Sequence, residues 1–384
     1  MAVHDRITNL DMASVRVAET VDPVASTDTV DPERRLKTVV LTNTRQSVRF
    51  DSYVPDHAPD PFLEYQCYAS CGIDQHLRDR NDFPINPWAN SGVFFAGIDV
   101  IRALRILIFD RDVDAVLCVF ENTALALVAL RWIFRFKPPI LLYEVSSRGW
   151  RWRDMALDFV LPRVEQVLTL TQHSKEYVER HYLLKRPAVV TGYSIDDQFF
   201  RPDAPLTTEL PAPDDFILAV EDDYSRDYET LVRAAAGLDL PLVLRTGCKL
   251  EIPEQQRDGV TIMPDRLSYR ELRDLYSRAS IVVLPLHPVD NPGGITSLFE
   301  GMAMGKPVIC TRTDTTVDYV RDGETGLLVA PEDLIALQAM IARVRADPAE
   351  ARRIGAAARQ YVALNLSKSR FVARMATAIR MIAS

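Results

Sequence analysis

Short apolar runs rich in β-branched residues alternate with longer helical stretches along most of this chain of 384 residues. The runs predict strands and the stretches predict helices, in the order typical of a parallel sheet with helices on both faces. The alternation stops at residues 201–215, which hold four prolines, and starts again at Phe216. The pattern therefore predicts two doubly wound α/β halves joined by a proline-rich segment. The first half is predicted to contain a helix over Ala124–Phe134 and strands over Thr38–Thr42, Ala115–Phe120, Ile140–Glu144, Val167–Thr171 and Ala188–Thr191. The second half is predicted to contain, among other elements, strands over Val260–Met263 and Leu327–Val329 and a helix over Tyr269–Arg278.

The chain divides into five predicted segments. Residues 1–35 lack any sustained period and are expected to be a disordered tail. Residues 36–200 are predicted to form a first Rossmann-like domain, 201–215 a linker and 216–364 a second such domain. Residues 365–384 are expected to form a helix that packs back on the first domain. Because ligands of doubly wound domains bind at the carboxyl ends of the strands, we expect a central cleft that both domains face.

The charge balance and the cysteines exclude several classes of protein. The chain carries 45 Lys and Arg against 53 Asp and Glu, a net charge of −8, which argues against nucleic acid as the main partner. No stretch approaches the roughly 20 apolar residues of a membrane span. The five cysteines are scattered rather than arranged as a disulfide framework, and Cys118 and Cys310 lie in apolar runs that predict burial. We recognise no signal peptide and expect a cytoplasmic protein.

Glycine is concentrated in one region of the sequence. Only 15 glycines are present, and six of them lie between residues 293 and 326. Gly293 and Gly294 precede a helix predicted to start at Thr296 or Ser297, and the N-terminus of a helix is a natural seat for phosphate. Glu300, one turn further on, could then bond a ribose hydroxyl. The pair Ser297 and Glu300 also fits a capping box, in which both only satisfy backbone donors. From these residues alone, both interpretations stay open.

The wider sequence resembles a known family. The stretch GGITSLFEGMAMGKPVICT, followed by VDYVRDGETGLLVAPED, resembles the C-terminal donor domain of family-four glycosyltransferases of the GT-B fold. The likeness extends over roughly residues 165–365 and is most specific from Tyr269 to Asp333. It implies two Rossmann-like domains facing a central cleft, with the acceptor on the N-terminal side. It also implies transfer of a sugar from a nucleotide diphosphate donor to an acceptor hydroxyl, with retention of configuration.

The resemblance assigns roles to individual residues. The donor diphosphate would lie on the turn and helix start, with a basic side chain neutralising it, and Glu300 would bind the ribose. The first Glu of the family's Glu-x7-Glu motif is replaced here by Pro292, and Asp290 and Asn291 are the nearest polar substitutes at the donor sugar. Glu221-Asp222 stand where Gly-Arg is usual. The diphosphate-binding residues implied are Arg226, Gly293, Gly294, Ile295, Thr296 and Ser297.

The acceptor side is less defined. Glu144 ends a predicted strand at the cleft and is a candidate catalytic group, whereas a structural ion pair competes with that role for Glu121. No metal or other cofactor is expected, because such enzymes stabilise the leaving phosphate with a helix dipole, N–H groups and basic side chains. The acids at Asp110, Asp112 and Asp114 are interpreted as a solvated turn, and His173 as a residue that lines the cleft or merely starts a helix.

Residues 131–153 combine six basic residues with three of the four tryptophans. Trp132, Ile133 and Phe136 are predicted to pack in the core, with the neighbouring Arg side chains reaching water. For the segment that follows, we expect contact with an acceptor or with anionic lipid at a membrane surface. The residues of this second patch are Arg148, Trp150, Arg151 and Trp152.

The sequence leaves three functions open. The first is a metal-independent glycosyltransferase that uses a UDP- or GDP-linked sugar and an acceptor that is a glycan, a lipid-linked sugar or a small molecule. The second is a pseudo-glycosyltransferase or natural-product glycosyltransferase with an atypical donor, which the loss of the first Glu at Pro292 favours. The third is a non-catalytic GT-B module that only binds a nucleotide-sugar.

Overall fold

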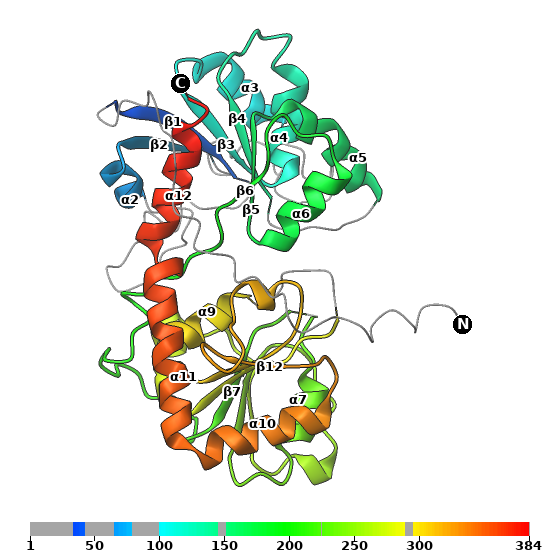
Figure 1. Cartoon of the computed structure of the whole chain (residues 1–384), viewed down its shortest axis with the longest axis vertical. Helices are drawn as coiled ribbons and strands as arrows, with labels where there is room; N and C mark the ends of the chain where they lie inside the picture. Colours follow the sequence, from blue (N-terminus) through cyan, green and yellow to red (C-terminus); the bar gives the residue numbers. More distant parts are fainter. Residues whose placement is uncertain are drawn as a thin grey trace. The chain divides into compact units, whose positions relative to one another are not determined.

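The computed structural model describes residues 34–42, 65–78, 100–144, 151–223, 225–288 and 295–383. The chain separates into residues 1–32 and a compact unit of residues 33–384, and all described elements belong to the second unit (Figure 1). Except for Arg34 and Arg35, the predicted disordered tail lies outside the described residues.

The N-terminal half is built on a six-stranded sheet in which every neighbouring pair is parallel, in the order β2-β1-β3-β4-β5-β6. Five of its strands were predicted to within two residues, whereas α2 (Tyr65–Ser70) and the edge strand β2 were not. The β2 sequence IDQHLR lacks the apolar run on which the other predictions rest. The strands are β1 (Leu36–Leu41), β2 (Ile73–Arg78), β3 (Ala115–Val119), β4 (Ile140–Glu144), β5 (Gln166–Thr169) and β6 (Val189–Val190).

Alternate residues of these strands build two cores, one on each face of the sheet. On one face, Cys118 and Leu142 pack with α3, α4 and α5. On the other face, Leu117 and Tyr143 pack with α12 (Lys368–Arg380), which brings the end of the chain onto the N-terminal sheet (Figure 1). The helices of this half are α3 (Val100–Phe109), α4 (Glu121–Leu130), α5 (Arg151–Val160), the short η3 (Leu161–Arg163) and α6 (Gln172–His181).

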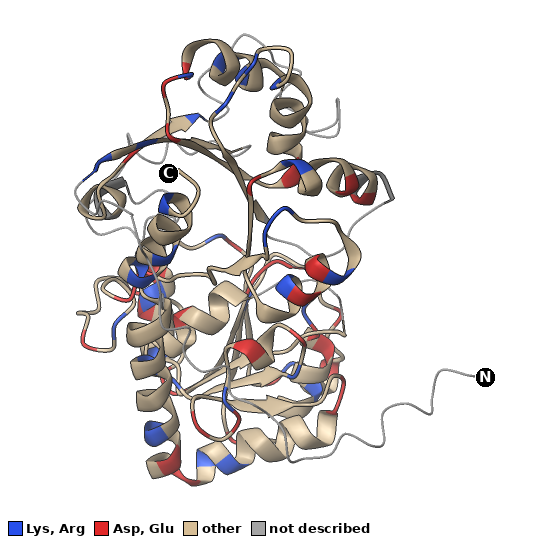
Figure 2. Cartoon of the chain, turned by 45° about the horizontal axis from the view of Figure 1, so that its top comes forward, with Lys and Arg blue, Asp and Glu red and all other residues tan. Residues whose placement is uncertain are grey.

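The C-terminal half repeats the design with a second parallel sheet, in the order β12-β11-β10-β7-β8-β9. Its strands are β7 (Ile217–Val220), β8 (Leu242–Arg245), β9 (Val260–Met263), β10 (Ile281–Leu284), β11 (Val308–Thr311) and β12 (Leu327–Val329). Its helices are α7 (Tyr228–Ala235), α8 (Tyr269–Arg278), α9 (Ile295–Ala303), α10 (Leu334–Ala346) and α11 (Pro348–Tyr361). Basic and acidic residues are interspersed over both halves, in keeping with the modest net charge (Figure 2).

Two stretches of chain cross between the halves, and the first crosses before Phe199 and Phe200, which pack in the core of the C-terminal half. Residues 201–215 form no helix or strand, but Asp274 of α8 accepts hydrogen bonds from the backbone N–H and hydroxyl groups of Thr207 and Thr208. This proline-rich stretch is therefore held along α8. The second connection runs from α11 through residues 362–366 into α12, where Nε of Arg374 donates to Thr191 O at 2.6 Å. Within the described residues, no helix is both long and apolar enough to cross a bilayer.

Candidate active site

Buried polar side chains gather where strands of the C-terminal sheet end. Arg245 is the last residue of β8, and Arg226 lies in the segment between β7 and α7. Ser297 and Glu300 lie on α9, which follows β10 and is marked in Figure 1. All four are at most 7% exposed. Burying two guanidinium groups and a carboxyl together costs free energy unless they are paired or held for a ligand, so this cluster marks a candidate site.

Arg226 joins the end of β7 to the start of α9. Its Nη2 donates to Oγ of Ser297 at 2.9 Å. The backbone around it is fixed as well, because His287 N donates to Ser225 O at 2.8 Å and Asp227 N donates to Pro285 O at 3.1 Å. Two of the residues predicted to bind a diphosphate are thus brought together, although they are 71 positions apart in the sequence.

Helix α9 begins at Ile295, one or two residues before the predicted start at Thr296 or Ser297. Ser297 therefore lies inside the helix and bonds Arg226, so the capping-box interpretation of Ser297 and Glu300 is wrong. The helix packs closely on the sheet, because a Cβ at Gly301 would meet Cγ1 of Val282 at 3.1 Å. It ends as predicted near Gly305, whose φ of +67° suits a residue without a side chain.

Glu300 is a buried carboxyl group with a free acceptor. It is 3% exposed, and its Oε2 has no hydrogen-bond partner among the described residues. Burial raises its pKa to about 8, helped by the charge of Glu221 and opposed by Tyr276, Arg245 and Arg226. A buried carboxyl with an unused oxygen can accept a hydrogen bond from a ligand hydroxyl.

The two acids after β7 differ in their surroundings. Glu221 has a φ of +123°, a conformation that glycine adopts far more readily, and its carbonyl accepts from the Tyr228 hydroxyl at 2.7 Å. Both carboxylate oxygens of Asp222 lie 3.0 Å from Nη1 of Arg245, and Oδ1 also accepts from Gly247 N at 2.6 Å. Desolvation opposes these contacts, which nevertheless lower the pKa of Asp222, so its negative charge is retained and paired.

Arg245 is a candidate site residue that the sequence pattern does not indicate. In the sequence it is simply the last residue of the apolar strand LVLR. Only the pairing of β8 with β7 places it beside Asp222. Its side chain is 9% exposed. Within the described part of the chain, its buried Nε has no hydrogen-bond acceptor. A charged residue that closes an otherwise buried strand is the signal that could have identified it.

Comparison with known proteins assigns the part of this cluster on α9 to a family. Residues 250–361 match the family described as "Glycosyl transferases group 1". This segment is a glycosyl transferases group 1 domain. It contains α8, β10, α9, β11, β12 and the helices α10 and α11, so Ser297 and Glu300 lie inside the matched region. Arg226 and Arg245 lie just before it.

Curated relatives share part of the C-terminal half. A glycogen synthase of Mycobacterium tuberculosis is 38% identical over 94 residues, which are 24% of this chain and 22% of that protein. An alpha-maltose-1-phosphate synthase of the same species is 36% identical over 138 residues, which are 34% of this chain and 35% of that protein. The chain thus spans about a third or less of the length of these relatives.

Solved structures match nearly the whole chain. Sucrose-phosphate synthase from Thermosynechococcus elongatus aligns with a TM-score of 0.70 at 19% identity, covering 90% of this chain and 99% of that one. Anabaena HepE in complex with UDP-glucose aligns with a TM-score of 0.62 at 12% identity, covering 89% and 98%. These likenesses establish the fold: the chain has the predicted GT-B arrangement of two Rossmann-like halves.

Several of the predicted donor-site residues lie inside the matched segment, before or at the start of α9. Asp290, Asn291, Gly293 and Gly294 lie outside the described residues, so their roles remain predictions. Within α9, Ile295 is buried, and Thr296 is partly exposed at the first turn. Thr296 is thus the predicted diphosphate residue on this helix that a ligand can reach most readily.

The structure describes the candidate acceptor-side residues of the N-terminal half only in part. Glu144 ends β4 in register with Thr169, and only its backbone is described. Glu121 is 7% exposed at the start of α4. His173 lies between the halves, since its backbone N–H and that of Gln172 point at Asp318, and its Nε2 is 3.7 Å from Asp314.

The basic and aromatic segment of residues 131–153 agrees with its prediction only in part. Arg148 and Trp150 lie outside the described residues, and Arg151 and Trp152 begin α5 with side chains that are not described. The expected core packing is confirmed for Phe136, which is 4% exposed. It is wrong for Trp132 and Ile133, which are 85% and 64% exposed. The reason is that α4 ends at Leu130 rather than Phe134, so the following turn directs these side chains into solvent.

Proposed function

We propose that this protein is a glycosyltransferase that takes a sugar from a nucleotide diphosphate donor and passes it to an acceptor hydroxyl. One observation carries the proposal: the buried constellation of Arg226, Ser297 and Glu300 at the start of α9, largely inside a group 1 domain. A helix start with a guanidinium beside it suits a diphosphate. A buried carboxyl one turn further along suits a ribose hydroxyl.

We assign the donor groups as follows. The diphosphate would accept hydrogen bonds from the α9 start and from Arg226, and Glu300 would bind the ribose. The Anabaena relative binds UDP-glucose, which supports a uridine nucleotide rather than a guanosine one. The proposed diphosphate residues are Arg226, Gly293, Gly294, Ile295, Thr296 and Ser297.

Arg245 is proposed as the second cation of the diphosphate site. The arginine usual after the first strand of the donor domain is Asp222 here, so the sequence lacks one positive charge at that position. Arg245 emerges from the neighbouring strand and binds Asp222, and its buried Nε has no acceptor among the described residues. The charge would therefore have moved from β7 to β8, with Asp222 now orienting the guanidinium.

The proposed chemistry needs no metal. The bond between the anomeric carbon and the diphosphate oxygen breaks, and a bond to the acceptor oxygen forms on the same face of the sugar. The acceptor proton passes to the departing phosphate. Positive charge from Arg226, Arg245 and the α9 dipole would stabilise the leaving group, and Glu144, Asp290 and Asn291 would orient acceptor and donor sugar.

Binding of nucleotides tests this function directly. UDP, UDP-glucose, GDP and GDP-mannose are titrated into the full chain by calorimetry, and we expect binding of the uridine compounds. Arg226→Ala and Glu300→Ala should each weaken binding by about tenfold or more, since each removes a charged or buried hydrogen-bonding partner. Arg233→Ala, on the exposed side of α7, is the matched control. If none of these four nucleotides binds, the proposal is refuted.

Turnover separates the alternative functions. Slow release of UDP from UDP-glucose without an acceptor is expected for the glycosyltransferase. Pro292, in place of the first Glu, favours an atypical donor such as a nucleotide-activated cyclitol. Binding of UDP without turnover of UDP-glucose would support this alternative. Tight binding with no turnover across a broad panel of donors would instead identify a non-catalytic module.

A further inference from the structure

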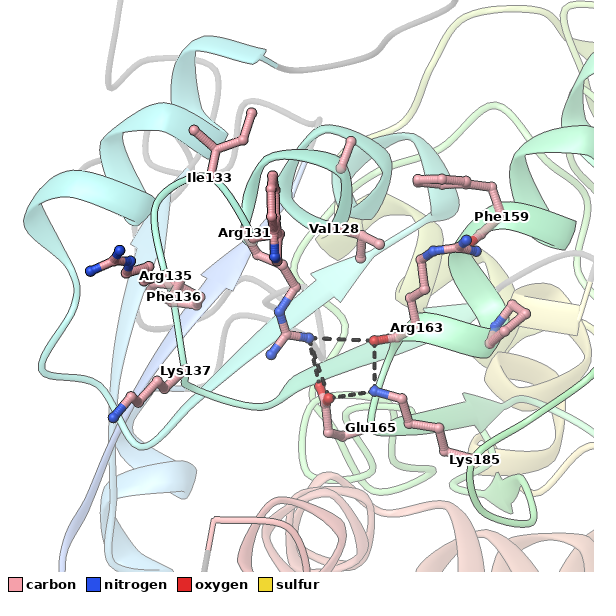
Figure 3. Close-up of a pocket in the computed structure, with 13 residues that line it drawn as sticks. Val128, Arg131, Ile133, Arg135, Phe136, Lys137, Phe159, Arg163, Glu165 and Lys185 are labelled. Atoms are coloured by element: carbon pink, nitrogen blue, oxygen red, sulfur yellow. Dashed lines mark hydrogen bonds and ion pairs between the residues drawn. The ribbon is translucent and has the colours of Figure 1, made fainter.

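A hollow of about 1050 Å³ opens on the N-terminal half beside the turn that follows α4. It lies at the edge of the sheet where β4 and β5 begin, since Ile140 N donates to Oε2 of Glu165 at 2.8 Å next to it. The candidate acceptor group Glu144 is at the other end of β4. The hollow, whose lining Figure 3 draws, is therefore separate from the proposed transfer site.

The lining of this hollow is strongly basic. Its one acid, Glu165, is paired with Arg131 at 3.1 Å and with Lys185 at 2.7 Å, as Figure 3 shows. Arg135 and Lys137 are exposed, and neither has an ion-pair partner within the described residues. The five cations are Arg131, Arg135, Lys137, Arg163 and Lys185, so the lining has a net charge of +4 on a chain of −8. This local excess of positive charge favours a polyanionic partner.

Apolar side chains project beside these cations. Trp132 and Ile133 are adjacent, 85% and 64% exposed, and Ile133 points away from the ribbon in Figure 3. The Arg163 guanidinium lies 4.1 Å from the centroid of the Phe159 ring, so that its charge sits on an aromatic face. A tryptophan and an aliphatic residue at the tip of a turn, flanked by arginine and lysine, match the chemistry of a membrane interface. A stable protein partner would instead favour a broader apolar area.

We propose that this surface, made of residues 131–137 with Phe159, Arg163, Glu165 and Lys185, docks on a bilayer that contains anionic lipid. Trp132 and Ile133 enter the headgroup region, and Arg135 and Lys137 face the lipid phosphates. Because β4 separates this surface from Glu144, docking leaves the proposed transfer site open. The proposal does not depend on the proposed glycosyl transfer, since it concerns a different edge of the sheet.

Vesicle binding of the full chain tests the proposal. Flotation is measured with phosphatidylcholine vesicles and with vesicles that also contain phosphatidylglycerol. We expect binding to the anionic vesicles, weakened by added salt. Arg135→Glu/Lys137→Glu should lower the partition coefficient by about tenfold or more, because each basic residue near an anionic surface contributes severalfold to binding. Trp132→Ser/Ile133→Ser should lower it by a similar factor through lost apolar contact.

Matched variants distinguish this surface from general charge or hydrophobicity. Arg352→Glu/Arg370→Glu changes the net charge by the same amount on exposed parts of the C-terminal helices, and Ile335→Ser removes a side chain that is 79% exposed. Both controls should bind vesicles like the unchanged protein, and thermal melting confirms that every variant is folded. Equal binding to neutral and anionic vesicles, or unchanged binding by Trp132→Ser/Ile133→Ser, would overturn the proposal. So would light scattering that shows a dimer lost in that variant, since the surface would then be a contact between two copies.

Discussion

Nη1 of Arg245 lies 3.0 Å from both carboxylate oxygens of Asp222, across the first two strands of the C-terminal sheet. The contact reverses a charge arrangement that the sequence resemblance implies, because the cation comes from β8 and the anion from the exit of β7. Asp222 is half exposed, whereas the Arg245 side chain is 9% exposed. The buried partner is thus the one held in a fixed orientation, as a group that binds a ligand should be.

Removing the positive charge of Arg245, and then restoring a positive charge at residue 222, tests whether this charge binds the diphosphate. Arg245→Met should weaken UDP binding roughly tenfold, as expected for loss of a charged hydrogen-bond donor. The double change Asp222→Arg/Arg245→Val, which restores the arrangement usual in the family, should recover most of that loss in calorimetry. If Arg245→Met binds UDP normally while Arg226→Ala does not, Arg245 has no part in the site and the proposed function still stands.

The backbone at Glu221 predicts a stabilising substitution. Its φ of +123° is unfavourable for a residue with a Cβ, and a strained conformation of this kind costs about 1 to 3 kcal/mol. Glu221→Gly should therefore raise the free energy of unfolding by about 1 kcal/mol, after the greater flexibility of glycine in the unfolded chain is subtracted. Urea denaturation measures the change. Glu221→Ala keeps the Cβ and removes the charge, so a similar gain in that variant would contradict the role of strain.

A close approach between α11 and the turn after α9 predicts a strongly destabilising substitution. A Cβ at Gly355 of α11 would lie 2.0 Å from the carbonyl oxygen of Gly305, just after α9. Gly355→Ala should lower the free energy of unfolding by about 2 kcal/mol or more, because backbone atoms must move apart. Arg352→Ala on the exposed part of the same helix is the control. Equal denaturation midpoints for the two variants would show that the two segments can separate at little cost.

The sequence predicted the C-terminal half more closely than the N-terminal half for a physical reason. There β9, α8 and β12 match their predicted bounds, because apolar runs are bounded by clear signals such as the capping box of Ser268 and Glu271. By contrast, β2 alternates buried and exposed residues at the edge of a sheet and resembles a loop in sequence. The sequence pattern predicts Trp132 in the core because apolar residues continue to Phe134, four residues beyond the observed end of α4.

The candidate site also divides into residues that the sequence predicts and residues that only the structure identifies. Arg226, Ser297 and Glu300 could be named from the sequence because they belong to a contiguous motif or to a recognised position before a helix. Arg245 could not, since its place depends on which strand pairs with β7. The burial of Glu300 and the strain at Glu221 likewise follow from packing that no local pattern specifies.

The buried carboxyl of Glu300 predicts a dependence of stability on pH. Its pKa is raised from 4.5 to about 8, first by burial and then by the charge of Glu221. Between these values the unfolded chain carries the ionised group while the folded protein keeps the proton. The free energy of unfolding therefore falls as the pH rises, by about 1.4 kcal/mol per pH unit.

Glu300→Gln removes this loss of stability. Urea denaturation should therefore give similar stabilities for the two proteins near pH 4.5 and a more stable variant at pH 8. Glu229→Gln, on the exposed side of α7, should follow the unchanged protein at every pH. A Glu300→Gln curve that runs parallel to that of the unchanged protein would mean that Glu300 ionises normally in the folded state.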